Sequence, residues 1–310
     1  MVQTEGLIVA FRSGRRLGWV AFFCGPAAVL YTVFVVVPLA TALWYSFYGW
    51  QGTTRGAPAG MANYAAVLGD YPYQEQVLKA FWHNVVFFAG TMLVQNTVGL
   101  GLAVLLHRNP RGKRMFQTLY SLPYLISPLV VGYLWSMMLS PAFGPVNAGL
   151  QAVGLDGLTR PWLGDPAIAL PVVVLVNAWQ WIGCPMLIFG AALAAVPAEM
   201  EEAAVIDGAS AWKAFWQVRF PLIMPAVGAV TLLTFVGCFN VFDLVFALGG
   251  SSGGPGQSMD VLGLLFYRIA FQGGVNAIGL SSALAMVMFV VVFGVALVVD
   301  RSLRRREVPW

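Results

Sequence analysis

Charged residues are scarce in this 310-residue chain: only 10% are Asp, Glu, Lys or Arg, against roughly one quarter in a soluble domain. Hydrophobic residues make up 59% of the chain, and the mean hydropathy is +0.77. This composition excludes an ordinary soluble protein and indicates an integral membrane protein.

Cysteine and histidine are also rare, with three and two residues. Cys24, Cys184 and Cys238 lie in apolar segments at unrelated spacing, which predicts neither a metal site nor a disulfide, so we expect small packing residues. His83 and His107 each lie near the end of a predicted membrane span, and we expect interface residues rather than a catalytic pair.

Nucleotide-binding motifs are absent as well. Lys113 and Lys213 lack the glycines of a Walker A loop, and the glycine-rich stretch 249–256 lacks the lysine. No basic stripe with interleaved aromatic residues occurs outside the span boundaries, so nucleic-acid binding is not expected. We expect a chain that is not an enzyme and that takes its energy from a partner or from an ion gradient.

Long uncharged runs divide the chain into membrane spans, each of which needs about 20 apolar residues. The first run could be a signal peptide, but it is about twice as long as the usual 7–15 residues, so we interpret it as a span. Pro123 and Pro128 predict kinks in the third span, and 249–256 predicts a flexible loop at the start of 249–273. The chain is thus expected to be an all-α integral membrane protein with one domain, 1–310, and six transmembrane helices at about 17–48, 81–106, 115–139, 167–196, 222–248 and 274–299.

The distribution of basic residues predicts the orientation. With six spans, both termini and the segment 197–220 lie on one side, and that side carries 13 of the 17 Lys and Arg residues. The other four are Arg55, Lys79, Arg160 and Arg268. Positive residues favour the cytoplasm, so we expect an N-in/C-in topology with 197–220 inside the cell.

The segment 197–220 is the one long polar stretch between two long apolar ones. Pro197 suits the first turn of a helix, and Glu199, Glu201 and Glu202 suit the positive end of its dipole. Gly208 can end that helix in the left-handed conformation. A second short helix should then begin after Ser210 as its cap and end at Pro221.

These residues also carry a family resemblance. Glu202-Ala203-Ala204, then Gly208, then nine residues to Val218, and Phe220-Pro221 are similar to the cytoplasmic loop motif of permease subunits in binding-protein-dependent ABC importers. Asp207-Gly208-Ala209 and Pro221-Leu222 resemble the carbohydrate-uptake branch, which includes maltose and glycerol-phosphate permeases. The resemblance implies the type I importer fold and a coupling helix that docks on an ATPase. It implies coupling roles for Glu202, Ala203, Ala204, Asp207 and Gly208.

Polar residues inside the spans are candidates for a solute pathway. Asp243 is the one charged residue deep in a predicted span, and it lies beside Asn240. It could accept hydrogen bonds from a sugar, or equally it could bond another helix or a sister subunit. Trp179 and Gln180, flanked by Asn177 and Trp181, form a second cluster suited to stacking and amide bonding, although tryptophans at such places often only pack.

The resemblance to maltose-type permeases implies sugar contacts at Trp179 and Thr234. Gly237, Cys238 and Val241 fall on contact positions that larger or polar residues occupy in those permeases. These departures argue against the same solute in the same pose, and the lack of Lys and Arg inside spans argues against a strongly anionic one.

The expected function is therefore one permease subunit of an ATP-driven importer for a carbohydrate or similar polyhydroxylated solute, in a bacterial plasma membrane. The resemblance implies a second homologous permease, two ATP-binding subunits that bind ATP and Mg, and an extracytoplasmic solute-binding protein. No cofactor is expected in this chain. The alternative is an ion-gradient-driven secondary transporter, against which the single intramembrane acid and the lack of a visible inverted repeat speak.

Overall fold

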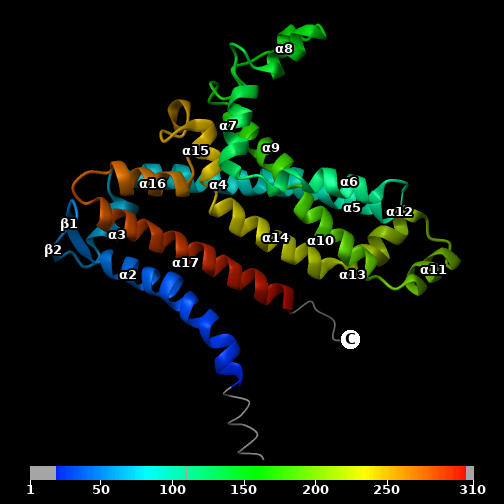
Figure 1. Ribbon diagram of the computed structural model, residues 1–310, viewed down its shortest axis with the longest axis horizontal. Coiled ribbons are helices and arrows are strands. Elements are labelled where there is room, and N and C mark those ends of the chain that lie inside the picture. Colours follow the sequence, from blue (N-terminus) through cyan, green and yellow to red (C-terminus); the bar gives the residue numbers. More distant parts are fainter. Residues whose placement is uncertain (1–18, 109, 305–310) are drawn as a thin grey trace, which may run out of the picture.

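The computed structural model describes residues 19–108 and 110–304, and within them the chain is mostly helical (Figure 1). Three helices are long and apolar enough to cross a membrane: Trp19–Tyr45, Tyr73–His107 and Ala277–Arg301. Three further pairs of helices pass the same criteria together but are bent at a short break, so the described residues hold up to six spans by length and composition. The basic residues predicted at both ends of the chain lie mostly outside the described residues.

The helices and strands lie close to the predicted segments. The first span is Trp19–Tyr45, with η1 (Thr32–Val36) and α2 (Val37–Tyr45) as its later part; the second is α4 (Tyr73–Thr91), η2 (Met92–Asn96) and α5 (Thr97–His107). The third is α6 (Lys113–Ser121), η3 (Pro123–Leu125) and α7 (Pro128–Met138); the fourth is α9 (Ala169–Trp181) and α10 (Gly183–Ala194). Then follow α11 (Ala198–Ile206), α12 (Ala211–Ala214), η5 (Phe215–Arg219), α13 (Phe220–Leu222), α14 (Met224–Phe239), α15 (Asp243–Gly249), η6 (Pro255–Gln257), α16 (Leu262–Gln272) and α17 (Ala277–Arg304).

The bends occur at prolines or close beside them. The predicted kink in the third span is confirmed: α6–η3 and α7 meet at 96°, and Ser127, which precedes Pro128, has an extended ψ of 132°. The ring of a proline disfavours the helical conformation of the residue before it. The fourth span bends by 49° beside Pro185, and α13 meets α14 at 68° beside Pro225.

Three connecting segments hold more structure than the sequence predicts. The hairpin β1 (Tyr48–Gln51) and β2 (Thr54–Pro58) and the helix α3 (Ala62–Gly69) precede the second span, which begins eight residues earlier than expected. The segment between the third and fourth spans contains α8 (Pro145–Ala152) and η4 (Asp156–Leu158). The segment 249–273, predicted to open with a loop, also contains α16, a helix whose apolar face is buried against α4 and α17.

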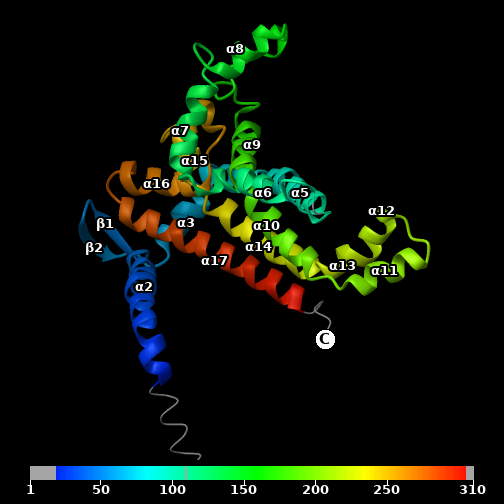
Figure 2. The same ribbon diagram turned by 45° about the vertical axis from the view of Figure 1, so that its right-hand side comes forward.

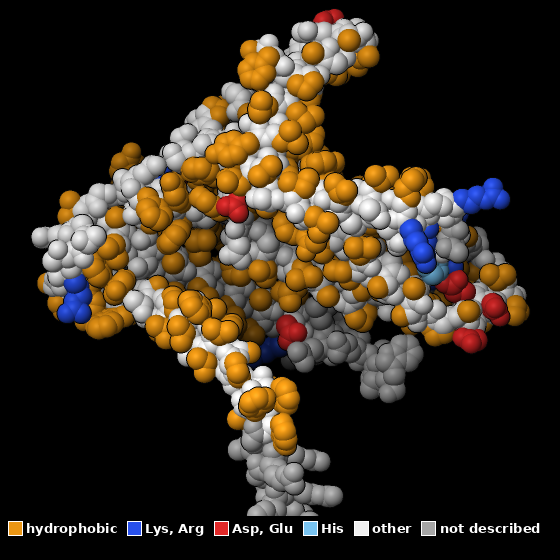
Figure 3. Space-filling model, in the orientation of Figure 1, with side chains coloured by type: hydrophobic (Ala, Val, Ile, Leu, Met, Phe, Trp, Pro, Cys, Tyr) orange, Lys and Arg blue, Asp and Glu red, His pale blue; other side chains and the backbone are white. Residues whose placement is uncertain are grey.

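The two ends of the molecule differ in what they hold. In Figure 1, the hairpin, α3 and α16 lie at one end, α11 and α12 lie at the other, and α4, α5, α14 and α17 run between them. In both views α7 and α9 carry α8 away from this body (Figure 2). Hydrophobic side chains cover much of the visible surface, and charged ones gather mainly around α11 and α12 (Figure 3). The surface along the long helices thus suits a lipid bilayer.

Buried side chains form three clusters along the body. One joins α4, α7, α9 and α15, and a second joins α4, α14, α16 and α17. A third joins α5, α10 and α14 near the end that carries α11. The bent helices are therefore held by packing on their neighbours.

Candidate functional site

The segment 197–220 forms a helix, a glycine turn and a second helix, largely as predicted. The first helix is α11, but Pro197 lies just before it as the N-cap, with an extended ψ of 134°, rather than in its first turn. Gly208 has a φ of +75°, and Ala209 N donates to Ala204 O at 2.9 Å behind it. The predicted glycine end of the helix is confirmed.

The second helix starts as expected and ends later. Ser210 Oγ accepts a hydrogen bond from Lys213 N at 3.3 Å, so the predicted cap is present. The helix does not end at Pro221 but continues to Leu222. A π-helical turn, η5, precedes the proline. Such a turn is wider than an α-helical turn, and we attribute the continuation to the room it leaves for the proline ring.

The surface of α11 combines carboxylates with small and apolar side chains. Of the five predicted coupling residues, Glu202, Ala203, Asp207 and Gly208 are exposed and Ala204 is buried. Large apolar side chains are exposed around them, with Ile206 at 84% and Trp212 at 72%. Within the described residues, Glu202 has no ion-pair partner. Exposed apolar groups beside unpaired charge are typical of a surface that another chain covers.

Glu201, the neighbour of Glu202, behaves differently. Its Oε2 accepts a hydrogen bond from Arg219 Nη2 of η5, and its Oε1 lies 3.9 Å from His107 Nε2 at the end of α5. Both partners line a cleft of about 1430 Å³ between α5 and the segment 201–219. These contacts of Glu201 were not predicted from the sequence, because Arg219 and His107 lie 18 and 94 residues away along the chain and belong to no common motif.

A second cavity, of about 490 Å³, lies among the second to fifth spans. Three of the predicted pathway residues line it: Thr234, Asn240 and Asp243. The cavity is also lined by the three positions at which this chain differs from maltose-type permeases, Gly237, Cys238 and Val241. The aromatic rings of Tyr124 and Trp181 line it as well.

The other two predicted pathway residues lie outside this cavity. Gln180 is fully buried, and its Nε2 donates to Ile126 O at 2.9 Å, where it ties the fourth span to the bend of the third. Trp179 is 41% exposed and packs edge-on against Trp135 at 5.5 Å between ring centroids. Along this helix the cavity is instead reached by Asn177 and Trp181.

Asp243 does not lie in the middle of a continuous span. The helix α14 ends at Phe239, and Asp243 is the first residue of the separate helix α15. A carboxylate at a helix start is favoured by the helix dipole, which offsets part of the cost of an acid at this depth. Its side chain is exposed at the cavity wall and has no ion pair within the described part of the chain.

The buried amides Gln95 and Asn96 of the second span, which join the polar residues at the cavity wall, were missed by the sequence interpretation. Asn96 Nδ2 donates to Thr234 Oγ1 at 3.0 Å, and Asn177 Nδ2 donates to Gln95 Oε1 at 3.4 Å. Gln95 Nε2 in turn donates to Asn96 Oδ1 at 3.3 Å, which links the two pairs. The signal was present as two adjacent amides in the middle of the second span.

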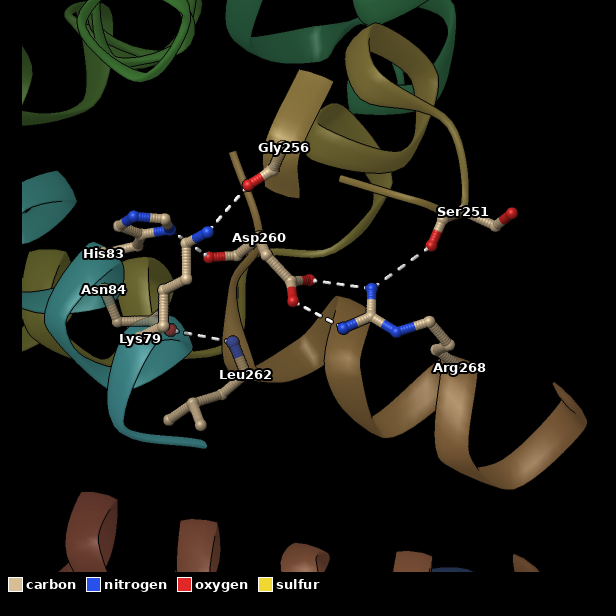
Figure 4. A network of polar contacts seen from close by, with 8 residues as sticks. All are labelled: Lys79, His83, Asn84, Ser251, Gly256, Asp260, Leu262 and Arg268. Carbon is tan, nitrogen blue, oxygen red and sulfur yellow. Dashed lines mark hydrogen bonds and ion pairs between the residues drawn. The ribbon is translucent and has the colours of Figure 1, made fainter. Parts of the chain in front are cut away.

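A further polar cluster lies near the end that holds the hairpin (Figure 4). Asp260 is 1% exposed and bonds Arg268 through both oxygens, at 3.2 and 2.5 Å. The pKa of the Asp260 carboxyl is raised above its ordinary value, because the effect of burial outweighs the opposing hydrogen bonds and charge of Arg268. Lys79 donates to Gly256 O and His83 Nδ1 lies 2.7 Å from Asp260 O.

Asn84 completes this cluster by linking three elements. Its Nδ2 donates to Cys238 O at 2.7 Å, and its Oδ1 accepts from Leu262 N at 2.9 Å. His83, which we expect at the membrane interface, is partly buried, and its ring lies within hydrogen-bond distance of the backbone of the segment before α16. Among the described residues there is no group of three side chains that could hold a metal ion.

Comparison with known proteins decides the family. Residues 95–307 match the model of the binding-protein-dependent transport system inner membrane component. The chain belongs to this family. It is a membrane protein of the ABC importer permease type, and the resemblance inferred from the coupling-loop motif is confirmed.

The relatives are permease subunits of similar length. The probable starch degradation products transport system permease protein AmyD of Thermoanaerobacterium thermosulfurigenes is 29% identical over 94% of this chain and 95% of its own. The sn-glycerol-3-phosphate transport system permease protein UgpA of Agrobacterium fabrum is 32% identical over 91% and 93%.

A solved structure shares the fold. The bacterial alginate ABC transporter, in complex with an alginate pentasaccharide-bound periplasmic protein, has a chain that superposes with a TM-score of 0.78. The match covers 95% of this chain and 97% of that one, at 20% identity. The chain thus has the type I importer permease fold.

Proposed function

We propose that this chain is one of two permease subunits of an ATP-driven importer for a carbohydrate or similar polyhydroxylated solute. A second homologous permease supplies the other half of the pathway, and an extracytoplasmic binding protein delivers the solute. Two ATP-binding subunits bind ATP and Mg and dock on α11 and its counterpart. This chain itself hydrolyses nothing.

The observation that carries the proposal is the exposed surface of α11. It offers Glu202 for a charge contact, the small Ala203 for close approach, and a left-handed turn at Gly208. The chain has no phosphate-binding loop of its own, so the energy has to enter through contact with another protein. Both ends of the segment run into spans that line the cavity, so a movement of α11 can reach it.

The cavity supports a polyhydroxylated solute. Asn177, Gln95, Thr234 and Asn240 offer amide and hydroxyl groups, and Tyr124 and Trp181 offer rings on which C–H faces can stack. It contains one acid and no base, which disfavours an anion. Relatives carry starch products and glycerol phosphate by name, and a transporter of the same fold imports the acidic polysaccharide alginate, so the names support a polyhydroxylated solute and leave its charge to the lining. A neutral saccharide is the solute class that fits the lining.

The topology belongs to the same proposal. With each bent pair counted as one span, six spans would leave α11 and both termini on one side of the membrane. We propose that this side is the cytoplasm, because 13 of the 17 basic residues then lie on it. The corresponding location is the plasma membrane of a bacterium, with the end of the molecule that holds the hairpin on the extracytoplasmic side.

The test is uptake by the reconstituted complex. The chain is co-expressed with the permease, ATPase and binding-protein genes that adjoin its own, and the complex is placed in proteoliposomes with labelled oligosaccharides. We expect uptake that needs both ATP and the binding protein. Uptake driven by a proton or sodium gradient without ATP would instead establish the secondary-transporter alternative and overturn the proposal.

A further inference from the structure

One carboxylate fastens α11 to the rest of the molecule. Glu201 bonds Arg219, which lies in η5 at the base of the fifth span. The same carboxylate lies 3.9 Å from the ring of His107, the last residue of the helix that forms the second span. The side chain of Glu201 in α11 therefore bonds the base of the fifth span and lies close to the end of the second.

The neighbouring acids make no such connection. Glu199 and Glu202 are exposed, and neither has an ion pair in the described part of the chain, whereas Glu201 is 27% exposed. The partners are similarly enclosed, at 23% for Arg219 and 26% for His107. Arg219 Nε is buried and makes no hydrogen bond to the described residues. The hydrogen bond of this guanidinium within the described part of the chain goes from Nη2 to Glu201.

Apolar packing alone does little to fix α11. Ala204 is its one buried residue, and the side chains of Val205 and Ile206 point into open surroundings, at 68% and 84% exposed. A partly exposed ion pair contributes only about 0–1 kcal/mol to folding. Its effect here is geometric, because it fixes the direction of a helix that little else constrains.

We propose that Glu201 is a positioning residue for energy coupling. Through Arg219 and His107 it holds α11, the end of the second span and the base of the fifth as one rigid body. A displacement of α11 by the ATPase then reaches two spans at once and not only the fifth, to which α11 is joined through the chain. The inference rests on the proposed function and concerns a residue outside the Glu202-Ala203-Ala204 motif.

The first experiment compares Glu201→Gln with Glu199→Gln as the matched control in the reconstituted complex. Solute imported per ATP hydrolysed is measured together with ATPase activity and co-purification of the ATPase subunits. We expect Glu201→Gln to import about fivefold less solute per ATP, a factor equivalent to about 1 kcal/mol, with ATPase subunits still bound. Glu199→Gln should resemble the unaltered chain. An unchanged ratio for Glu201→Gln would overturn the proposal.

The second experiment replaces the ion pair by a covalent link. Glu201→Cys with Arg219→Cys is made with the three native cysteines retained, because Cys184 and Cys238 line the proposed pathway. A short dithiol-reactive crosslinker is added, and the unaltered chain treated in the same way is the control. We expect poor coupling before crosslinking and recovery after it, because the proposal requires the two residues to stay together throughout transport. If the link instead blocks uptake and its cleavage restores it, the two segments must separate and the proposal is wrong.

The two proposals fail in different ways. If the unaltered complex shows no ATP-dependent uptake, the proposed function falls. If it transports normally and both experiments give the contrary results, only the role of Glu201 falls.

Discussion

The two polar ends of this molecule use similar residues in opposite ways. At the hairpin end, Asp260 is almost fully buried and both its oxygens are bonded by Arg268. At the α11 end, Glu202 and Asp207 are exposed and have no ion-pair partner among the described residues. A buried charge must be paired within its own chain, whereas an exposed unpaired charge is available to another molecule.

This difference separates structural polar groups from interaction groups without reference to motifs. Glu201 lies between the two cases, since it is half-buried and paired within the chain, yet it lies beside the exposed coupling residues. The comparison predicts that substitutions in the polar cluster at the hairpin end lower stability, and that substitutions of the predicted coupling residues, such as Glu202, lower transport and leave stability unchanged.

The largest effect is expected from Asp260→Asn. The change leaves Arg268 mostly buried without a counter-charge, which costs about 3–5 kcal/mol. Thermal unfolding of the purified protein in detergent should show a strong fall in stability. Asp156→Asn, at an exposed position, is the control and should have no effect. If Asp260→Asn were as stable as Asp156→Asn, the buried pair at the hairpin end would not stabilise the fold, and the proposed difference between the two ends would be refuted.

Glu202→Lys should have the next largest effect, this time on transport. Reversal of an interfacial charge costs about 2 kcal/mol or more in association, or roughly thirtyfold in affinity. We expect uptake to be lost, with membrane insertion and thermal stability unchanged. Normal uptake by Glu202→Lys combined with Gly208→Pro would refute the assignment of α11 as the coupling helix.

Gly208→Ala tests the turn itself. At a φ of +75° a side chain costs about 1–2 kcal/mol. No atom lies within 4 Å of the added Cβ, so the cost comes from the backbone alone. We expect a moderate loss of uptake, and Gly190→Ala, which also has open space around its Cβ, as a neutral control. A Gly208→Ala variant with full uptake would show that the angle at this turn does not matter for coupling.

The smallest effect is expected from Asp243→Asn. Loss of a charge at a helix start changes stability by about 0.3–1 kcal/mol. If the carboxylate also bonds solute hydroxyls, the apparent KM for uptake should rise several-fold while the stability loss stays within that limit. A stability loss with an unchanged KM would assign Asp243 to structure alone.

Sequence patterns predicted the features that depend on local chemistry. The six apolar segments, the kink at Pro128, the turn at Gly208 and the cap at Ser210 each follow from the residues themselves. Composition and local conformational preference are sufficient for these, because they do not depend on distant parts of the chain.

Features that depend on tertiary packing were missed. The network of Gln95, Asn96 and Asn177 forms only when the second and fourth spans meet, and α16 is a short helix that packing on α4 and α17 stabilises. The break before Asp243 could not be seen either, since 240–242 holds neither glycine nor proline. Which residues line the cavity among the second to fifth spans likewise depends on the rotation of each helix about its axis. For this reason Trp181 lines the cavity and Trp179 does not.

The glycine-rich stretch 249–256 has a practical consequence for anyone who labels this protein. Its composition is typical of a flexible linker, but Gly253 has a φ of +74°, and a Cβ added there would lie 3.1 Å from Asp260 Cα. An epitope tag or fluorophore inserted there would disturb the Asp260–Arg268 pair. Gly154, beyond α8, has no atom within 4 Å of the same position and is the better place for a reporter.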